Sequence, residues 1–417
     1  MAKRAKIWTA LGVAVLTGAS VAEAGALKSF APIDNPQMIL VDGEGGEGGG
    51  EGGGTSSDMI YALESTDATA FAYDAGPQVA AYIDLAYKSY EKAADDAATM
   101  EKAVDAFLAA PSAETLDAAR KAWIAARPAY LHTEAFRFYD GPIEAVEGEI
   151  NSWPMNEAYI DYVEGKPDAG IINDPKINLD IDMLEGVNQK QDETNVTIGW
   201  HAVEFLLWGQ DLSVDGPGNR PFTDYIAGQG NNDRRRTYLK LVTSQLAKEL
   251  HDLEEKWELD EAGSYAASFK ALPPREAIGR MVNGMAILAG YEFMSERLAV
   301  ALDSGDQEDE HSCFSDTTKQ DFVHDLVGIK AVWDKAGLNA LTAKRDAALA
   351  ARVDGLFADA EKKIAALGDP WDKVLASPKG SPARKDAEAV VVALQALAGG
   401  LKDVGSKLGV LVLIPSG

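Results

Sequence analysis

The residues in this sequence best suited to chemistry are His201 and Glu204, which lie three positions apart in the segment GWHAVEFLLWG at 199–209. At this spacing the two side chains share one face of an α-helix. Metal sites in helical bundles use an imidazole and a carboxylate from one helical turn in this way. Gly199, which lacks a side chain, would let a ligand or another helix approach closely. Taken alone the pair is a weak signal, because a structural ion pair or a hydrogen-bonded polar pair in the core has the same spacing.

The surroundings of the pair predict that it is buried. Most other side chains in the segment are apolar, so its helix should be covered on nearly every side. A carboxylate in such a place is costly unless it is paired, protonated or bound to a metal. We therefore interpret His201 and Glu204 as half of a buried site that needs further residues to complete it.

One group of candidates for completing the site forms a stripe. Its members are four, three, four and three residues apart: Trp123, Arg127, Tyr130, Glu134 and Arg137. Pro128 should kink or restart this helix. Glu134 and Arg137 could face the His201 pair, either completing a metal shell or holding the carboxylate ionised. The alternative is an intrahelical Glu–Arg pair on a solvated edge.

A second group is the acidic segment DSGDQEDEHSCFSD at 303–316. It crowds eight candidate ligands together: Asp303, Asp306, Glu308, Asp309, Glu310, His311, Cys313 and Asp316. The spacing is not that of an EF-hand loop, and oxygen donors with one imidazole suit iron or calcium. Most of these acids fit a solvated loop equally well. We expect His311 and Cys313 to be partly buried near the junction of two halves, with Glu292 and Glu296 pointing the same way.

The elements that position these residues are predicted to be helices. From about residue 76, apolar positions recur every three or four residues, and long helices are expected over 79–110, 112–130, 193–209, 233–260, 273–302, 318–368 and 383–411. The pattern in 160–190 also allows one or two short strands. Each of two long helices is followed by a Pro-Ser or Ser-Pro break and another helix, which indicates a duplication. The fold class is therefore all-α, with two four-helix-bundle-like halves at roughly 58–250 and 275–417.

The N-terminal residues have the composition of an export signal. Lys3, Arg4 and Lys6 precede a short apolar stretch, and Ala22-Glu23-Ala24 supplies a cleavage pattern. The alternative is an uncleaved anchor. We expect a signal peptide at 1–24, a flexible Gly/Glu-rich linker at 25–57 and the functional domain at 58–417, with no later membrane span. The exported protein would reside in the periplasm or at the outer membrane or cell surface.

Charge and cysteine content exclude some functions. The 417 residues hold 39 basic and 66 acidic side chains, a formal net charge of −27, which disfavours binding to nucleic acid and favours cations. Cys313 is the only cysteine, so an internal disulfide is excluded.

Several segments resemble the imelysin-like family. GWHAVEFLLWGQDL is similar to its Gly-x-His-x-x-Glu signature. The segments WIAARPAYLHTEAFRFYDGPIE, GPGNRPFTDY, NNDRRRTYL and ERLAVALDSGDQEDEHSCFSDTT resemble the family's iron-regulated branch. The resemblance covers most of 58–417 and implies two bundle-like helical halves, a cell-envelope location and expression tied to iron supply. Carrying over the motif implies metal binding through His201 and Glu204, with iron as the expected metal and zinc or calcium as alternatives.

These observations favour a binding protein over an enzyme. The leading hypothesis is an envelope protein that binds a metal or small ligand and takes part in iron acquisition or homeostasis. Other envelope iron-uptake proteins are candidate partners, and the oligomeric state is left open. A metallopeptidase, the activity in the family's label, would need three protein ligands and a water, and the usual His-Glu-x-x-His pattern is absent. A scaffold that binds a peptide or small ligand without metal is the other alternative.

Overall fold

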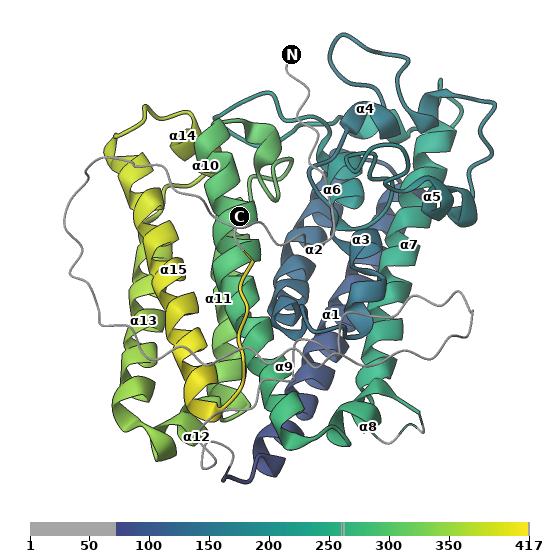
Figure 1. The fold of residues 1–417 in the computed structure, drawn as a ribbon. Helices are drawn as coiled ribbons and strands as arrows, with labels where there is room; N and C mark the ends of the chain where they lie inside the picture. The colour runs from purple at the N-terminus through teal and green to yellow at the C-terminus, as the bar shows by residue number, and fades with distance from the viewer. Residues whose placement is uncertain (1–71, 260, 262, 416–417) are drawn as a thin grey trace, which may run out of the picture. The chain divides into compact units, whose positions relative to one another are not determined.

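The regular structure of the chain is helical throughout its described part, which is residues 72–259, 261 and 263–415 of a computed structural model (Figure 1). All of these residues belong to one unit, Asp42–Gly417. Among the described residues, the 160–190 region contains one isolated β-bridge, between Val163 and Lys166, instead of the one or two short strands that its sequence allowed. The expected signal peptide at 1–24 and linker at 25–57 lie outside the described residues.

The first group of helices carries the predicted motif. It contains α1 (Gly76–Ala109), α2 (Ala113–Leu131), α6 (Trp200–Trp208) and α7 (Asn232–Trp257). Helix α1 packs along both α2 and α7, and α6 contacts α2 and α7. Ser112 caps α2 in a capping box with Thr115, at the start of the helix expected over 112–130.

The second group begins with one long, nearly continuous helical rod. It consists of α9 (Pro274–Ile287), the π-helix η6 (Leu288–Ala299) and α10 (Val300–Ser304). Three further helices complete the group: α11 (Thr318–Lys335), α13 (Ala347–Ala366) and α15 (Pro382–Leu408). Helix α15 packs on α13, η6 and α9. Helix α11 joins the groups, because it also contacts α2 and the 3-10 helix η2 (His132–Phe136).

Short helices fill the connections. They are η3 (Pro142–Ala145), α3 (Glu147–Ile150), α4 (Glu157–Ile160), η4 (Ile171–Asn173), α5 (Ile181–Val187), η5 (Phe222–Tyr225), α8 (Tyr265–Lys270), η7 (Gln307–Asp309), α12 (Leu338–Arg345) and α14 (Trp371–Leu375). The all-α prediction is confirmed. The duplication and the domain boundaries stay predictions.

Two predictions were wrong in the extent of a helix. The helix expected over 193–209 begins only at Trp200, because Gly199 before it has a positive φ of 89°. Pro128 lies within α2, but the helix ends three residues later and Arg137 is extended, so the stripe from Trp123 to Arg137 is broken. The long helices expected over 318–368 are α11, α12 and α13, with Gly337 in the left-handed conformation between the first two.

One described helix, α15, is long and apolar enough by length and composition to cross a membrane. Half of its apolar window is buried inside the structure, where Leu394, Leu397 and Leu401 are fully covered. The packing of this face against α13, η6 and α9 accounts for its apolar character.

Candidate functional site

The short helix α6 is placed by its first residue, Gly199. All nine residues of α6 are buried. Besides its positive φ, Gly199 has no room for a side chain, because a Cβ there would lie 2.5 Å from the carbonyl oxygen of Ile150 and 2.6 Å from that of Glu149. The close approach expected at this glycine is therefore made by backbone from the end of α3. It brings the next residue, Asn151, to the start of α6.

The other end of α6 is held by side chains that bind its last carbonyl groups. Arg120 on α2 donates to the oxygen of Leu207 from Nε at 3.0 Å and from Nη2 at 2.9 Å. Tyr225 donates its hydroxyl to the oxygen of Leu206, and the backbone N–H of Arg220 donates to that of Trp208. The last carbonyl groups of α6 have no N–H partner within the helix, and these hydrogen bonds provide one. So short a helix can therefore lie fully buried.

His201 and Glu204 contact each other on this helix, as their spacing predicts. Nδ1 of His201 lies 2.9 Å from Oε2 of Glu204, and both side chains are buried. The other oxygen, Oε1, accepts hydrogen bonds from the backbone N–H of Ser315 at 2.9 Å and from its hydroxyl at 2.6 Å. Burial raises the pKa of Glu204 to about 8, although the Ser315 bonds favour the charged form.

Arg127 on α2 connects this pair to a second histidine. Its Nη2 lies 3.3 Å from Nε2 of His201 and 3.2 Å from Nε2 of His311. A guanidinium can only donate, so both Nε2 atoms must accept and both rings carry their proton on Nδ1. Burial, and then the charge of Arg127, lowers the pKa of His201, and burial with Arg297 and Arg127 lowers that of His311. Both imidazoles are therefore neutral.

Carboxylate and amide groups surround His311 as well. Its Nδ1 lies 2.7 Å from Oδ2 of Asp321 on α11, a contact without hydrogen-bond alignment. The same oxygen accepts from the hydroxyl of Ser312 at 2.6 Å. Asn151 accepts from Nη1 of Arg127 at 2.5 Å and contacts Nε2 of His311 at 3.3 Å through its amide nitrogen. Each imidazole thus has a carboxylate on its Nδ1 side and Arg127 on its Nε2 side.

The space left at this centre is small. The guanidinium of Arg127 lies over the rings of Trp123, Tyr130 and Trp200, between 5.4 and 5.8 Å from their centroids. A cavity beside His201 and His311, also lined by Cys313, leaves about 10 Å³ of water-accessible space. Such a volume admits about one water-sized molecule.

Glu134 and Arg137 lie in a separate buried network. Oε2 of Glu134 is 2.7 Å from Nη1 of Arg137 and 2.7 Å from Nη2 of Arg297. Nη1 of Arg297 is 2.8 Å from Asp325 on α11, and its Nη2 is 3.3 Å from Glu292. Burial opposes ionisation of Glu134, but the two arginines hold its pKa well below the usual range. The structure does not bring Glu134 to the His201 pair.

The other predicted residues are distributed between these clusters. His311 and Cys313 are both buried, and burial raises the pKa of the Cys313 thiol well above its usual value. Glu292 lies 4.0 Å from Arg137 and so belongs to that network rather than to the His311 region. Burial, and then the charge of Glu296, raises the pKa of Tyr291. The acidic segment does reach the motif, through His311 and Ser315. The metal roles predicted for His201, Glu204 and Glu134 stay predictions.

Several residues of this centre were missed by sequence reasoning. Arg127 belongs to the stripe and Ser315 to the acidic segment, but neither is predicted to contact the His201 pair, and Asn151 and Asp321 belong to no motif. Each is polar and at most 5% exposed. A polar residue within an apolar helical pattern was the available signal for Arg127 and Asp321. Asn151 and Ser315 lie in irregular segments and carried no such signal.

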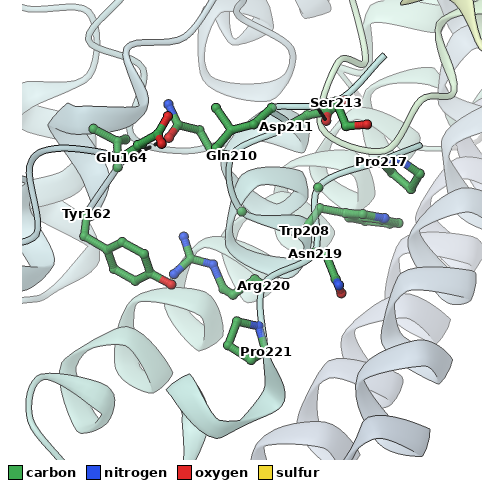
Figure 2. A pocket seen from close by; sticks show the side chains of 14 residues that line it. Tyr162, Glu164, Trp208, Gln210, Asp211, Ser213, Pro217, Asn219, Arg220 and Pro221 are labelled. Atoms are coloured by element: carbon green, nitrogen blue, oxygen red, sulfur yellow. Dashed lines mark hydrogen bonds between the residues drawn. The ribbon is translucent and has the colours of Figure 1, made fainter. Parts of the chain in front are cut away.

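A larger pocket opens beyond the C-terminal end of α6 (Figure 2). Its volume is about 430 Å³, and it is lined by the loops around Gln210 and Asn219 together with Tyr162. Arg220 lies at its inner wall, where Nη1 is 2.7 Å from Oδ2 of Asp161. Asp211 is one of its lining residues, between Gln210 and Ser213.

Comparison with known proteins identifies the family. The family model described as Imelysin, of the peptidase M75 group, matches residues 86–399. The iron-regulated protein A of Synechococcus elongatus is 23% identical over 325 residues, which cover 73% of this chain and 79% of that protein.

Two crystal structures resemble the fold. One is a protein from Parabacteroides distasonis described as a candidate iron-regulated protein A precursor, with a TM-score of 0.64 and 20% identity, covering 83% of this chain and 97% of that one. The other is an imelysin-like protein from Psychrobacter arcticum, with a TM-score of 0.58 and 15% identity, covering 82% and 98%. Because the family model matches well over half of its residues, the chain belongs to the imelysin family.

Proposed function

We propose that this protein is exported to the cell envelope, takes part in iron acquisition or homeostasis, and binds iron as its cargo at the centre formed by His201 and His311. Membership of the imelysin family and the name of the Synechococcus relative support the link to iron. The basic and apolar N-terminal residues support export, and the net charge of −27 favours cations.

The observation that carries the proposal is the convergence of two neutral imidazoles on one point. Nε2 of His201 and Nε2 of His311 both lie within 3.3 Å of the same nitrogen of Arg127. A carboxylate lies on the far side of each ring, Glu204 for the first and Asp321 for the second. Histidines that bind metals have this kind of partner, which fixes the ring and raises its basicity. Imidazole nitrogen is a ligand suited to iron and zinc.

These residues fit a metal ion if Arg127 withdraws. The two Nε2 atoms would then hold the ion, with Oδ1 of Asn151 as an oxygen ligand nearby. Glu204 would position His201 rather than bind the ion, because both of its oxygens are already in contact with His201 and Ser315. The guanidinium would be exchanged for another cation, so the buried Asp321 would keep a positive neighbour.

Calorimetric titration with ferrous, ferric, zinc and calcium ions tests the proposal. The His201→Ala, Glu204→Ala double variant should lose iron binding. A matched control is available on α7, where His251 and Glu254 form the same three-residue pattern, 3.2 Å apart, on the surface. The His251→Ala, Glu254→Ala variant should bind iron as the wild type does. Equal iron binding by the wild type and the His201→Ala, Glu204→Ala variant would contradict the proposal.

Arg127 supports a second candidate, a binder of small anionic ligands without metal. A buried guanidinium held over three aromatic rings is suited to a carboxylate or phosphate group. The Arg127→Gln variant separates the two candidates. If the cation displaces Arg127, the variant should bind iron at least as tightly as the wild type. If Arg127 anchors an anion, the variant should lose binding of that anion and gain no affinity for iron.

A further inference from the structure

Three aspartates from distant parts of the chain meet outside the histidine centre. Asp211 follows α6, Asp316 lies two residues before α11, and Asp372 is in α14. One carboxylate oxygen from each lies within 4.8 Å of the other two. Like charges this close repel one another unless something positive lies between them.

Asp372 is the member of the cluster whose burial is least compensated by hydrogen bonds. It is only 2% exposed, and neither of its carboxylate oxygens accepts a hydrogen bond from an N–H or hydroxyl group. Its hydrogen-bonding neighbours are the carboxyl groups of Glu310 and Asp316. Glu310, which is 1% exposed, has one unpartnered oxygen and interacts electrostatically with Asp372. Asp316 also has one oxygen without a partner. Buried carboxylates in this state are costly, so the group calls for a cation or for bound protons.

Arginine side chains neutralise another buried aspartate, Asp161, in a way that they do not neutralise this cluster. Asp161 is paired with Arg220 at 2.7 Å and with Arg235 at 2.6 Å. By contrast, the groups acting most strongly on Asp316 are other carboxylates. Burial, followed by Asp372 and Asp211, raises the pKa of Asp316 to about 9. Burial and Asp372 raise that of Glu310 well above its usual value.

We propose that Asp211, Asp316 and Asp372 bind a divalent cation of the calcium class. Every donor in the group is oxygen, which suits calcium and does not suit zinc, whose protein sites favour nitrogen and sulfur. Asp211 also lines the pocket of about 430 Å³, which gives the ion a route from solvent (Figure 2). This cation site is separate from the proposed iron centre and does not depend on it.

A rival acidic group does not carry the same argument. Glu149, Glu185 and Glu249 also gather their oxygens, but Gln245 donates its amide to Glu185 at 2.6 Å and to Glu249 at 3.0 Å. In the aspartate cluster, Gln307 and the backbone N–H of Ser213 donate only to Asp211. The difference lies in Asp372, which has neither oxygen served by such a donor, whereas the glutamate group has no member in that state.

The bound cation would hold three segments together. It would join the loop after α6, which belongs to the first group of helices, to α14 in the C-terminal part of the chain. It would also fix Asp316, whose φ is 58°, next to Ser315, which binds Glu204. The cation is thus expected to stabilise the segment that carries His311.

The test is thermal unfolding of the full chain, after removal of metals with EDTA, with and without added calcium chloride. The wild type should gain several degrees in Tm with calcium, because the ion binds only the folded state. The Asp316→Asn, Asp372→Asn double variant keeps the shape of the site, and asparagine tolerates the positive φ at 316. Without calcium this variant should be more stable than the wild type, because it lacks the repulsion. With calcium it should gain nothing.

Calcium affinity is measured by calorimetry on the same proteins. The double variant should bind at least about tenfold more weakly than the wild type. Asp303→Asn, an exposed position in the same acidic segment, removes one charge and should bind normally. The His201→Ala, Glu204→Ala variant should also keep the calcium effect, which separates this site from the iron centre. Asp211→Asn, alone, serves if the double variant fails to fold. No calcium effect on the wild type, or an equal effect on the double variant, would overturn the proposal.

Discussion

Nη2 of Arg127 lies 3.3 Å from Nε2 of His201 and 3.2 Å from Nε2 of His311, so one guanidinium fixes the tautomer of both rings. The same nitrogen is 3.7 Å from Asp321, which makes it a counter-charge for that buried carboxylate. One side chain therefore links α2, α6 and α11. The stability of this junction and the protonation of its histidines depend on the same contact.

Replacing Arg127 by methionine should destabilise the fold. It would leave Asp321 buried without its cation, a change that costs about 3–5 kcal/mol in comparable sites. Chemical denaturation measures the loss. Arg352→Met is the control, since Arg352 pairs with Asp403 at a surface where both side chains are about half exposed, and it should change stability by less than about 1 kcal/mol. Similar losses in the two variants would contradict this account of Arg127.

Replacing Gly199 by alanine should also be strongly destabilising. The residue has a φ of 89°, and the new Cβ would lie 2.5 Å from the oxygen of Ile150. A cost of about 2 kcal/mol or more is expected from the strain and the displaced backbone. Gly186→Ala provides the comparison, because a Cβ there meets nothing within 4 Å. It should be neutral or stabilising, since Gly186 lies within α5.

The Ser315→Ala variant should weaken the support of Glu204. Its hydroxyl donates to Oε1 of Glu204 at 2.6 Å, and loss of a hydrogen bond to a buried carboxylate costs about 1–3 kcal/mol. The pKa of Glu204, already raised by burial to about 8, should rise further. Denaturation curves and a carboxyl NMR titration measure the two effects. Ser377→Ala removes an exposed hydroxyl bonded within its own segment and should leave both quantities nearly unchanged.

Glu249 should make stability depend on pH. Burial raises its pKa in the folded protein from 4.5 to about 8, so between these values the folded state holds a proton that the unfolded state has released. Stability should therefore fall as pH rises from about 4.5 to 8. The Glu249→Gln variant should flatten this part of the profile and be more stable at pH 8 by roughly 1–3 kcal/mol. If the stability of the Glu249→Gln variant falls between pH 4.5 and 8 as steeply as that of the wild type, the raised pKa of Glu249 is contradicted.

Local pattern in the sequence was enough to predict the helices and the shared face of His201 and Glu204. Periodicity and capping act over a few residues, and Ser112 and Pro382 start their helices where such rules expect. The apolar flanks likewise predict the burial of α6, which the structure has throughout.

The completion of the site depends on contacts that no local pattern encodes. Arg127 and His311 reach His201 from 74 and 110 positions away along the chain, because α2, α6 and the 310–318 segment pack together. The expected partners, Glu134 and Arg137, face His201 only if the helical stripe continues past Pro128. The chain leaves the α-helix at His132, so these side chains turn to Arg297 instead. Asp372, in a helix of five residues, had no periodic signal at all.

The π-helix η6 sets the register of the Arg297 network. Glu292 and Arg297 are five residues apart yet only 3.3 Å separates their charged groups, a pairing that the wider turns of a π-helix permit. On an α-helix the same two side chains would point about 140° apart. Deleting one residue between Leu288 and Glu292 would let the segment relax to α-helical turns and rotate every preceding residue relative to Arg297. A length change of a single residue here is therefore expected to be less tolerated than most substitutions in the same rod.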